Sequence, residues 1–178
     1  MDRCAGEPRA RPGPATGVHP SEFRRVFGRL PTGVTVITAY TREGPTGMAA
    51  NSVTSVSLQP PLVLLCPARS SATWPLIRAA GQFCISVLAG HQEEVARRFA
   101  ARGADRFAGI GWQPRRGGPA LDDALAWIDA ELRHEHDAGD HTIAVARVIA
   151  VEAGPGTSPL VFLRGGYGQF WRGRRESA

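Results

Sequence analysis

Residues 34–66 read VTVITAYTREGPTGMAANSVTSVSLQPPLVLLC, three extended segments in close succession. The first and last of them, residues 34–40 and 62–66, are rich in the β-branched and apolar residues that strands favour. The middle segment, residues 46–58, also favours an extended backbone, because Val, Thr and Ser crowd together without helical spacing and Pro60-Pro61 closes the run. Strands that follow one another this closely predict antiparallel pairing.

The rest of the chain continues the same organisation. Further strand patterns occupy residues 82–88, 124–137, 141–153, 159–165 and 167–172. Helical patterns are limited to residues 21–30, 70–81 and 91–102. Because strands adjoin one another and no βαβ alternation runs through the chain, a mainly β fold is expected, a closed antiparallel barrel with a few short helices rather than a doubly wound sheet.

Two of the helical patterns carry clear end signals. The first is capped by Ser21 and shows an apolar stripe with helical spacing, formed by Phe23, Val26, Phe27 and Leu30. The second has Pro75 in its first turn and Gly81 just past its end.

Length and composition indicate one domain. Residues 1–19 are rich in Pro, Gly, Ala and Arg, so we expect a disordered tail, an ordered domain over residues 20–174 and a short tail at 175–178. The 178-residue chain has a net charge of +5, and all 21 basic residues are Arg. Arg suits anionic ligands, although a compositional bias explains most of the excess. The Arg residues are dispersed and aromatics make up only 7%, which argues against a nucleic-acid-binding barrel.

The cysteines and the hydropathy pattern bear on the compartment. Cys66 and Cys84 lie inside apolar strand patterns far from Cys4, which is typical of a reduced cytosolic protein with inert thiols. No apolar run approaches the length of about 18 residues that predicts a membrane span, and the N-terminus lacks a signal-peptide core. We therefore expect a cytoplasmic protein.

Three segments carry polar side chains that could serve a site. Neither face of residues 46–58 is cleanly apolar, which raises the question of what their hydroxyls and the Asn51 amide bind. Residues 68–74, ARSSATW, combine an Arg with hydroxyls at a predicted helix start, a pattern typical of phosphate binding and equally of ordinary helix capping. Residues 134–141, HEHDAGDH, hold three His and three acidic residues.

The His-rich segment allows two interpretations. His134 and His136 share one face of a strand, so a metal site must be weighed, but no matching ligand set appears elsewhere and a polar hairpin end explains the cluster. We predict no metal. His141 follows the predicted turn Gly139-Asp140 and leads into an apolar strand, which places its imidazole at the mouth of the barrel.

Several common site motifs are missing from the sequence. It has no G-x-S-x-G, no G-x-G-x-x-G after a strand and no Walker loop. A nucleophilic hydrolase is therefore disfavoured, and any nucleotide is held without a Gly-rich loop.

Taken together, the segments LPTGVTVIT, TGMAANSVTSVSLQPPLVLLC, ARSSATW, RRFA, DRFAG, GDHTIAVARV and PLVFLRGGYG resemble the flavin reductase family. The resemblance spans residues 20–172 in the family's order. It implies a Greek-key split β-barrel that works as a homodimer, reduces FMN or FAD with NADH or NADPH, and supplies reduced flavin to a partner flavin-dependent monooxygenase.

The resemblance also implies a role for individual residues. The stretch of Asn51, Ser52, Val53 and Thr54 would contact the polar edge of the flavin ring, and Arg69, Ser70, Ser71 and Thr73 would bind its phosphate. The remaining matches are Arg98 and Phe99 near the flavin, Tyr167 at its rim and His141 beside the nicotinamide. His141 would position the nicotinamide without acting as a general base. Gly166 departs from the pattern, because relatives often carry a basic residue there.

The main alternative is a non-catalytic flavin- or haem-binding protein on the same barrel, since fold does not fix function. The position of His141 favours the reductase.

Overall fold

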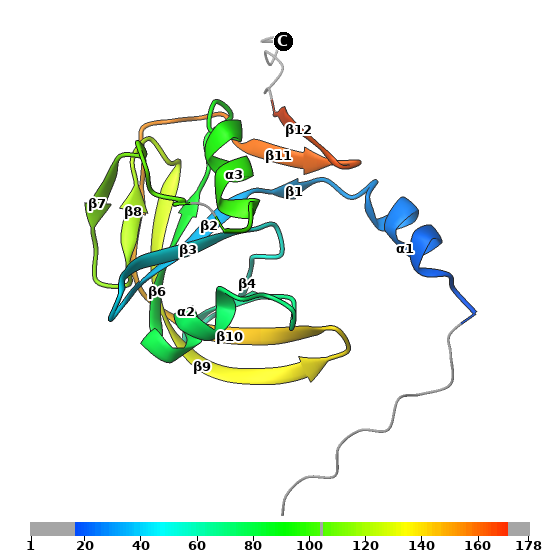
Figure 1. The fold of residues 1–178 in the computed structure, drawn as a ribbon, viewed down its shortest axis with the longest axis horizontal. Helices are drawn as coiled ribbons and strands as arrows, with labels where there is room; N and C mark the ends of the chain where they lie inside the picture. The colour runs from blue at the N-terminus through cyan, green and yellow to red at the C-terminus, as the bar shows by residue number, and fades with distance from the viewer. Residues whose placement is uncertain (1–16, 104, 171–178) are drawn as a thin grey trace, which may run out of the picture.

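The computed structural model describes residues 17–103 and 105–170 (Figure 1). The first 16 residues of the predicted tail and the predicted C-terminal tail lie outside the described residues. The elements are α1 (Pro20–Phe27), β1 (Thr32–Gly33), β2 (Thr35–Thr41), β3 (Gly44–Ala50), β4 (Thr54–Leu58), β5 (Pro61–Leu65), α2 (Trp74–Ala80), β6 (Gln82–Val87), α3 (Glu93–Ala100), β7 (Trp112–Pro114), β8 (Pro119–Leu121), β9 (Ala126–Ala138), β10 (His141–Ala153), β11 (Leu160–Leu163) and β12 (Gly166–Gln169).

The predicted mainly β, antiparallel split-barrel architecture is confirmed, but the barrel is not closed as the strand pattern predicted. Seven strands form a curved sheet in the order β3-β2-β6-β9-β10-β5-β4, and β1, β11 and β12 form a second sheet beside it (Figure 1). The edge strands β3 and β4 are not paired with each other in the described part of the chain, so the barrel stays open there. The segment predicted as one strand over residues 46–58 is instead divided between these two edges, with residues 51–53 as the connection.

The helices differ from the sequence predictions mainly at their ends. Helix α2 begins at Trp74, has Pro75 in its first turn and ends at Gly81, whose φ of 73° is left-handed as expected for a helix C-cap. The cap of helix α1 lies two residues earlier than predicted: Pro20 takes the first helical position and His19, not Ser21, is the cap, because His19 Nδ1 accepts a hydrogen bond from the Ser21 N–H. The three helices described have only seven or eight residues, well short of the roughly 20 that cross a bilayer.

Two apolar clusters fill the barrel. One lies under α2 and includes Ile37, Leu65, Ile77 and Phe83; the other lies under α3 and includes Phe99. Burying each of these side chains contributes about 1.5–3 kcal/mol. The apolar stripe of α1 behaves differently, because Phe23, Val26, Phe27 and Leu30 are 50–61% exposed.

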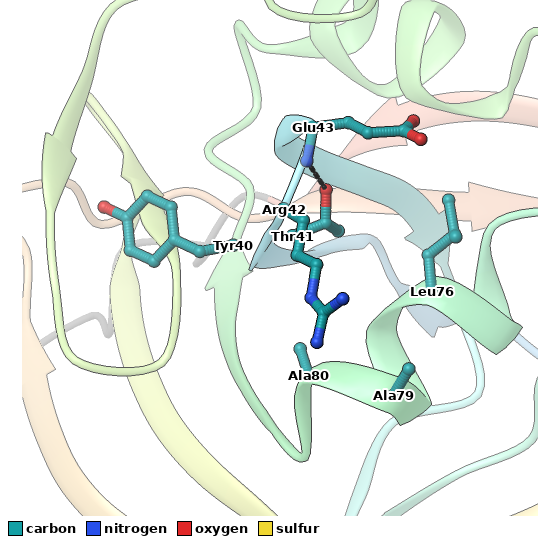
Figure 2. Close-up of a pocket in the computed structure, with 7 residues that line it drawn as sticks. All are labelled: Tyr40, Thr41, Arg42, Glu43, Leu76, Ala79 and Ala80. Carbon is teal, nitrogen blue, oxygen red and sulfur yellow. Dashed lines mark hydrogen bonds between the residues drawn. The ribbon is translucent and has the colours of Figure 1, made fainter.

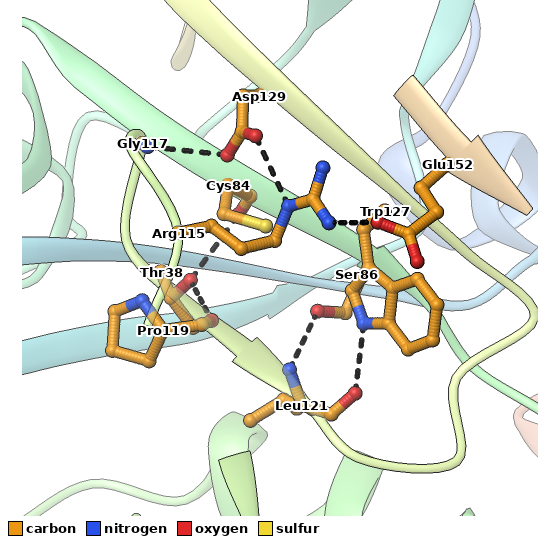
Figure 3. A network of polar contacts seen from close by, with 10 residues as sticks. All are labelled: Thr38, Cys84, Ser86, Arg115, Gly117, Pro119, Leu121, Trp127, Asp129 and Glu152. Carbon is orange, nitrogen blue, oxygen red and sulfur yellow. Dashed lines mark hydrogen bonds and ion pairs between the residues drawn. The ribbon is translucent and has the colours of Figure 1, made fainter. Parts of the chain in front are cut away.

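A buried polar network attaches the β7–β8 hairpin, which no strand pattern in the sequence predicted, to the main sheet (Figure 3). Asp129, 2% exposed, accepts hydrogen bonds from Arg115 Nε at 3.0 Å and from the Gly117 N–H at 3.1 Å. The Thr38 hydroxyl donates to Pro119 O at 2.6 Å. A Cβ atom at Gly117 would lie 2.3 Å from Phe83 O, so only Gly fits where the hairpin turn crosses the sheet.

Cys84 lies within this network and should be chemically inert in the folded protein. Burial, reinforced by the charge of Asp129, raises the pKa of the Cys84 thiol to about 12, so almost none of it is thiolate at pH 8. Peptide mapping after iodoacetamide treatment at pH 8 should find Cys84 unmodified in the native protein and modified after denaturation. Native labelling as fast as that of a free thiol would show that the strand opens readily.

Candidate functional site

Asn51 and Tyr167, two of the predicted cofactor residues, lie together in one hollow. This rim pocket, of about 130 Å³, is lined by Val34, Ala49, Ala50, Asn51, Phe162 and Tyr167. The β11–β12 hairpin supplies the aromatic side of the pocket and the end of β3 supplies the other. Tyr167 is held by an edge contact with Phe162 at 5.3 Å and by the Arg97 guanidinium 5.0 Å from its ring centroid.

A second hollow, the α2–α3 groove, brings together four further predicted residues. It has a volume of about 420 Å³, and its lining includes Ala49, Ser70, Ser71, Thr73, Phe99 and Arg106. Ala49 lines both hollows, so the rim pocket and the groove meet at the end of β3. Gly47 allows α3 to pack closely there, because a Cβ atom at this position would lie 2.8 Å from Phe99 Cε1.

Hydroxyl groups at the start of α2 are fixed by local hydrogen bonds. Ser71 Oγ accepts from the Trp74 N–H at 3.1 Å and so satisfies the first backbone N–H of α2, whereas the N-cap residue is Thr73, whose side chain makes no capping hydrogen bond. Thr73 Oγ1 accepts from Arg106 Nη1 at 2.7 Å, which leaves the Thr73 hydroxyl proton available for another acceptor.

Arg106 is the residue of this groove that sequence reasoning missed. Its guanidinium also donates to Gly47 O and Ala101 O, and so ties the loop after α3 to β3. The DRFAG motif identified the segment but gave no sign that Arg106 reaches Thr73, a contact across 33 residues.

Two predicted Arg residues lie outside the groove lining. The Arg69 N–H donates to Asp140 O at 2.9 Å, and its half-exposed guanidinium is 3.5 Å from the Asp137 carboxylate. Arg98 lies 3.8 Å from Glu94 and donates to Ala108 O. The structure thus brings neither side chain into the set around Ser70, Ser71 and Thr73.

The three residues after Asn51 lie outside the rim pocket, and each has different neighbours. Ser52 Oγ accepts from the Cys66 N–H at 2.9 Å, and Val53 packs against the apolar cluster under α2. Thr54 is exposed at the start of β4. Of the four predicted ring contacts in this stretch, only Asn51 lines the rim pocket.

His141 occupies the predicted position at the end of the β9–β10 hairpin. Gly139, with a φ of 66°, and Asp140 form the turn, and His141 pairs with Ala138 across the hairpin and with Ala68 on the other side. Since Ala68 lines the α2–α3 groove, the His141 backbone adjoins the groove. The imidazole is 45% exposed.

Asp140 orients the His141 ring. His141 Nδ1 lies 2.7 Å from Asp140 Oδ1, and this hydrogen bond, with the charge of His141, lowers the pKa of Asp140 below its ordinary value. A proton on Nδ1 satisfies the carboxylate and leaves Nε2 as the free position of the ring.

The remaining His residues of this segment do not assemble a metal site among the described residues. The rings of His134 and His136 have centroids 6.5 Å apart, and no group of three or more His, Cys, Asp or Glu in that part of the chain could hold an ion.

A third hollow contains none of the predicted residues. It has a volume of about 550 Å³ and lies between the β2–β3 turn and α2, with Tyr40, Arg42 and Leu76 in its lining (Figure 2). The Glu43 N–H donates a hydrogen bond to the Thr41 hydroxyl oxygen inside the turn, so these two groups stabilise the turn.

A split antiparallel barrel with an aromatic pocket that adjoins a groove rich in hydroxyls and Arg defines the class of flavin-binding split-barrel proteins. The family described as "Flavin reductase like domain" matches residues 27–170. This chain belongs to the flavin reductase family.

Individual relatives match this chain over most of their length. A flavin reductase from Pseudomonas putida is 43% identical over 157 residues, covering 87% of this chain and 92% of the relative. The reductase subunit HsaB of a flavin-dependent monooxygenase from Mycobacterium tuberculosis is 41% identical, covering 84% and 82%. The solved NADH:FAD oxidoreductase SgcE6 from Streptomyces globisporus superposes with a TM-score of 0.81 at 38% identity, covering 89% and 99%.

Proposed function

We propose that this chain is an NAD(P)H-dependent flavin reductase that supplies reduced FMN or FAD to a partner monooxygenase. The observation that carries the proposal is the junction at Ala49 of an aromatic rim pocket with a groove of hydroxyl and Arg side chains. A flavin has the same two parts, a planar ring and a phosphorylated chain. Family membership supports the assignment, as do one relative that is an NADH:FAD oxidoreductase and another that is the reductase subunit of a flavin-dependent monooxygenase.

Each part of the site has a task in this reaction. Asn51 and Tyr167 hold the ring, while Ser70, Ser71 and Thr73 bind phosphate near the positive charge of Arg106. A flavin held by these residues would supply the hydride acceptor, with the nicotinamide as hydride donor and solvent as the source of the accompanying proton. The protein contributes orientation and exclusion of water, so no general base is needed.

A homodimer is part of the same proposal. The apolar stripe of α1 is exposed over four residues, and Phe23 and Phe27 stack at 4.3 Å between ring centroids. A contiguous apolar surface of this kind marks an interaction site. A second copy of this chain is the proposed occupant, and gel filtration with light scattering should give twice the chain mass.

The reductase activity is tested by mixing the pure protein with NADH or NADPH and free FMN or FAD. Catalytic loss of absorbance at the nicotinamide band, with oxygen or a cytochrome as final acceptor, is the expected result. A protein that binds flavin and gives no turnover with any of the four pairs would be a carrier on the same barrel.

A further inference from the structure

Four Arg side chains surround a hollow outside the site described above. This Arg pocket, of about 360 Å³, is lined by Arg24, Arg25, Arg29 and Arg164, with Gly28 and Gly165 between them. Its lining residues come from the C-terminal end of α1 and the β11–β12 turn, two segments that Figure 1 shows next to each other. The two elements are joined by the Arg164 N–H, which donates to Gly28 O at 2.8 Å.

Arg164 adopts a backbone conformation that does not suit it. Leu163 pairs with Gly166, so Arg164 and Gly165 form a two-residue hairpin turn, with φ values of 52° and 81°. Asn-Gly or Asp-Gly is the favoured pair when both turn residues need positive φ, and an Arg at the first position carries a conformational cost. Arg164 lies at the edge of a hollow that three other Arg side chains also line. Its presence is therefore better explained by its charge than by the conformational preference of the turn.

The charges of the pocket are largely uncompensated within the described residues. Only Arg25 has a carboxylate partner there, Glu22 at 3.2 Å, and both side chains are more than 60% exposed, so the pair is weak. The helical period places Arg24 and Arg25 on the side of α1 away from Phe23 and Phe27, and Arg29 follows in the turn after the helix. The pocket therefore stays accessible when the apolar stripe is covered.

The surroundings of the pocket connect it with the proposed hydride transfer. On one side, Tyr167 of the rim pocket lies on β12, three residues after Arg164. On the other side, the hydrogen bond and charge of His141 chiefly lower the pKa of Asp140, and the Arg24 guanidinium makes the smallest contribution, behind the effect of burial and the backbone.

We propose that the Arg pocket binds the pyrophosphate of the nicotinamide dinucleotide while its nicotinamide lies near His141. Guanidinium groups match phosphate oxygens in paired, bidentate geometry, and several of them around one concave surface suit a doubly charged group better than a single carboxylate. This inference rests on the proposed function, since it concerns the hydride donor of that reaction.

The test uses Arg164→Asn in the full-length protein. Asn suits the turn conformation, so the variant should keep or raise the melting temperature while losing the charge. The matched control is Arg42→Asn, because Arg42 is an exposed Arg in the two-residue turn of the β2–β3 hairpin. Steady-state kinetics with saturating flavin compare NADH with reduced nicotinamide riboside, a donor that carries no phosphate.

The expected result is a KM for NADH about three- to tenfold higher in Arg164→Asn, with a shallower dependence on salt, and unchanged kinetics with the riboside donor. Arg42→Asn should match wild type with both donors. Equal losses with both donors, unchanged NADH kinetics, or a loss that appears only with FAD as acceptor and not with FMN would each overturn the inference. A wild-type protein with no turnover would instead refute the reductase function itself.

Discussion

Replacing Arg69 with Ala is expected to raise the dissociation constant of FMN about 10- to 150-fold and to leave that of riboflavin nearly unchanged. A charge-assisted contact with a phosphate is worth about 1.5–3 kcal/mol. Arg69 now pairs with Asp137 at 3.5 Å, and both side chains are exposed, so this ion pair is worth at most about 1 kcal/mol. Asp137 therefore competes poorly with a phosphate for the Arg69 guanidinium. The side chain next to Ser70 should therefore exchange this carboxylate for phosphate when flavin binds.

A fluorescence titration of FMN and riboflavin against each variant measures the effect. Arg78→Ala is the matched control, since Arg78 is equally exposed and pairs with Glu135 at 3.7 Å on the far end of α2. Equal weakening of FMN and riboflavin would exclude a phosphate contact by Arg69. Unchanged FMN binding would show that Arg69 does not contact the phosphate, and Arg106 would then be the residue that supplies positive charge at the α2–α3 groove.

The parts of the fold that the sequence predicted well are those set by local chemistry. Gly81 restricts the backbone at its own position, so the C-terminal end of α2 followed from it, whereas the predicted range of 70–81 began four residues before the helix does. Gly139-Asp140 likewise marked the turn that positions His141. Family resemblance then grouped residues such as Asn51 and Tyr167, which 116 positions of chain separate and which one pocket joins.

The parts that were missed depend on contacts distant in sequence. Strands β7 and β8 have three residues each, too few for a periodic pattern, and they are held by Asp129 and Thr38 from other strands. Arg106 is surrounded by ordinary loop residues, and only folding brings it to Thr73. The sequence identified the apolar stripe of α1 but not its exposure, because a helical pattern identifies a face without saying what covers it.

His141→Ala is expected to slow hydride transfer to bound flavin, or to raise the KM for the nicotinamide, by about 10- to 100-fold, with little change in flavin affinity. The structure gives the imidazole a fixed orientation through Asp140 at 2.7 Å, at a strand end next to the α2–α3 groove. A side chain held in this way is suited to positioning a substrate, and misplacing nicotinamide C4 relative to flavin N5 costs a penalty of this size.

Proton transfer would give a different signature. Hydride transfer takes no proton from the imidazole, so titration of His141 should not produce a steep limb in the pH profile of the wild-type rate. The profiles of wild type and His141→Ala should therefore have the same shape. Stopped-flow reduction of bound flavin, across pH and donor concentration, separates the two roles. Asp140→Asn is the companion variant, because it keeps an oxygen near Nδ1 but removes the charge that orients the ring; it should lie between wild type and His141→Ala. Unchanged reduction rates in both variants would make His141 a structural residue of the turn, and a selective loss of flavin binding would assign it to the flavin instead of the nicotinamide.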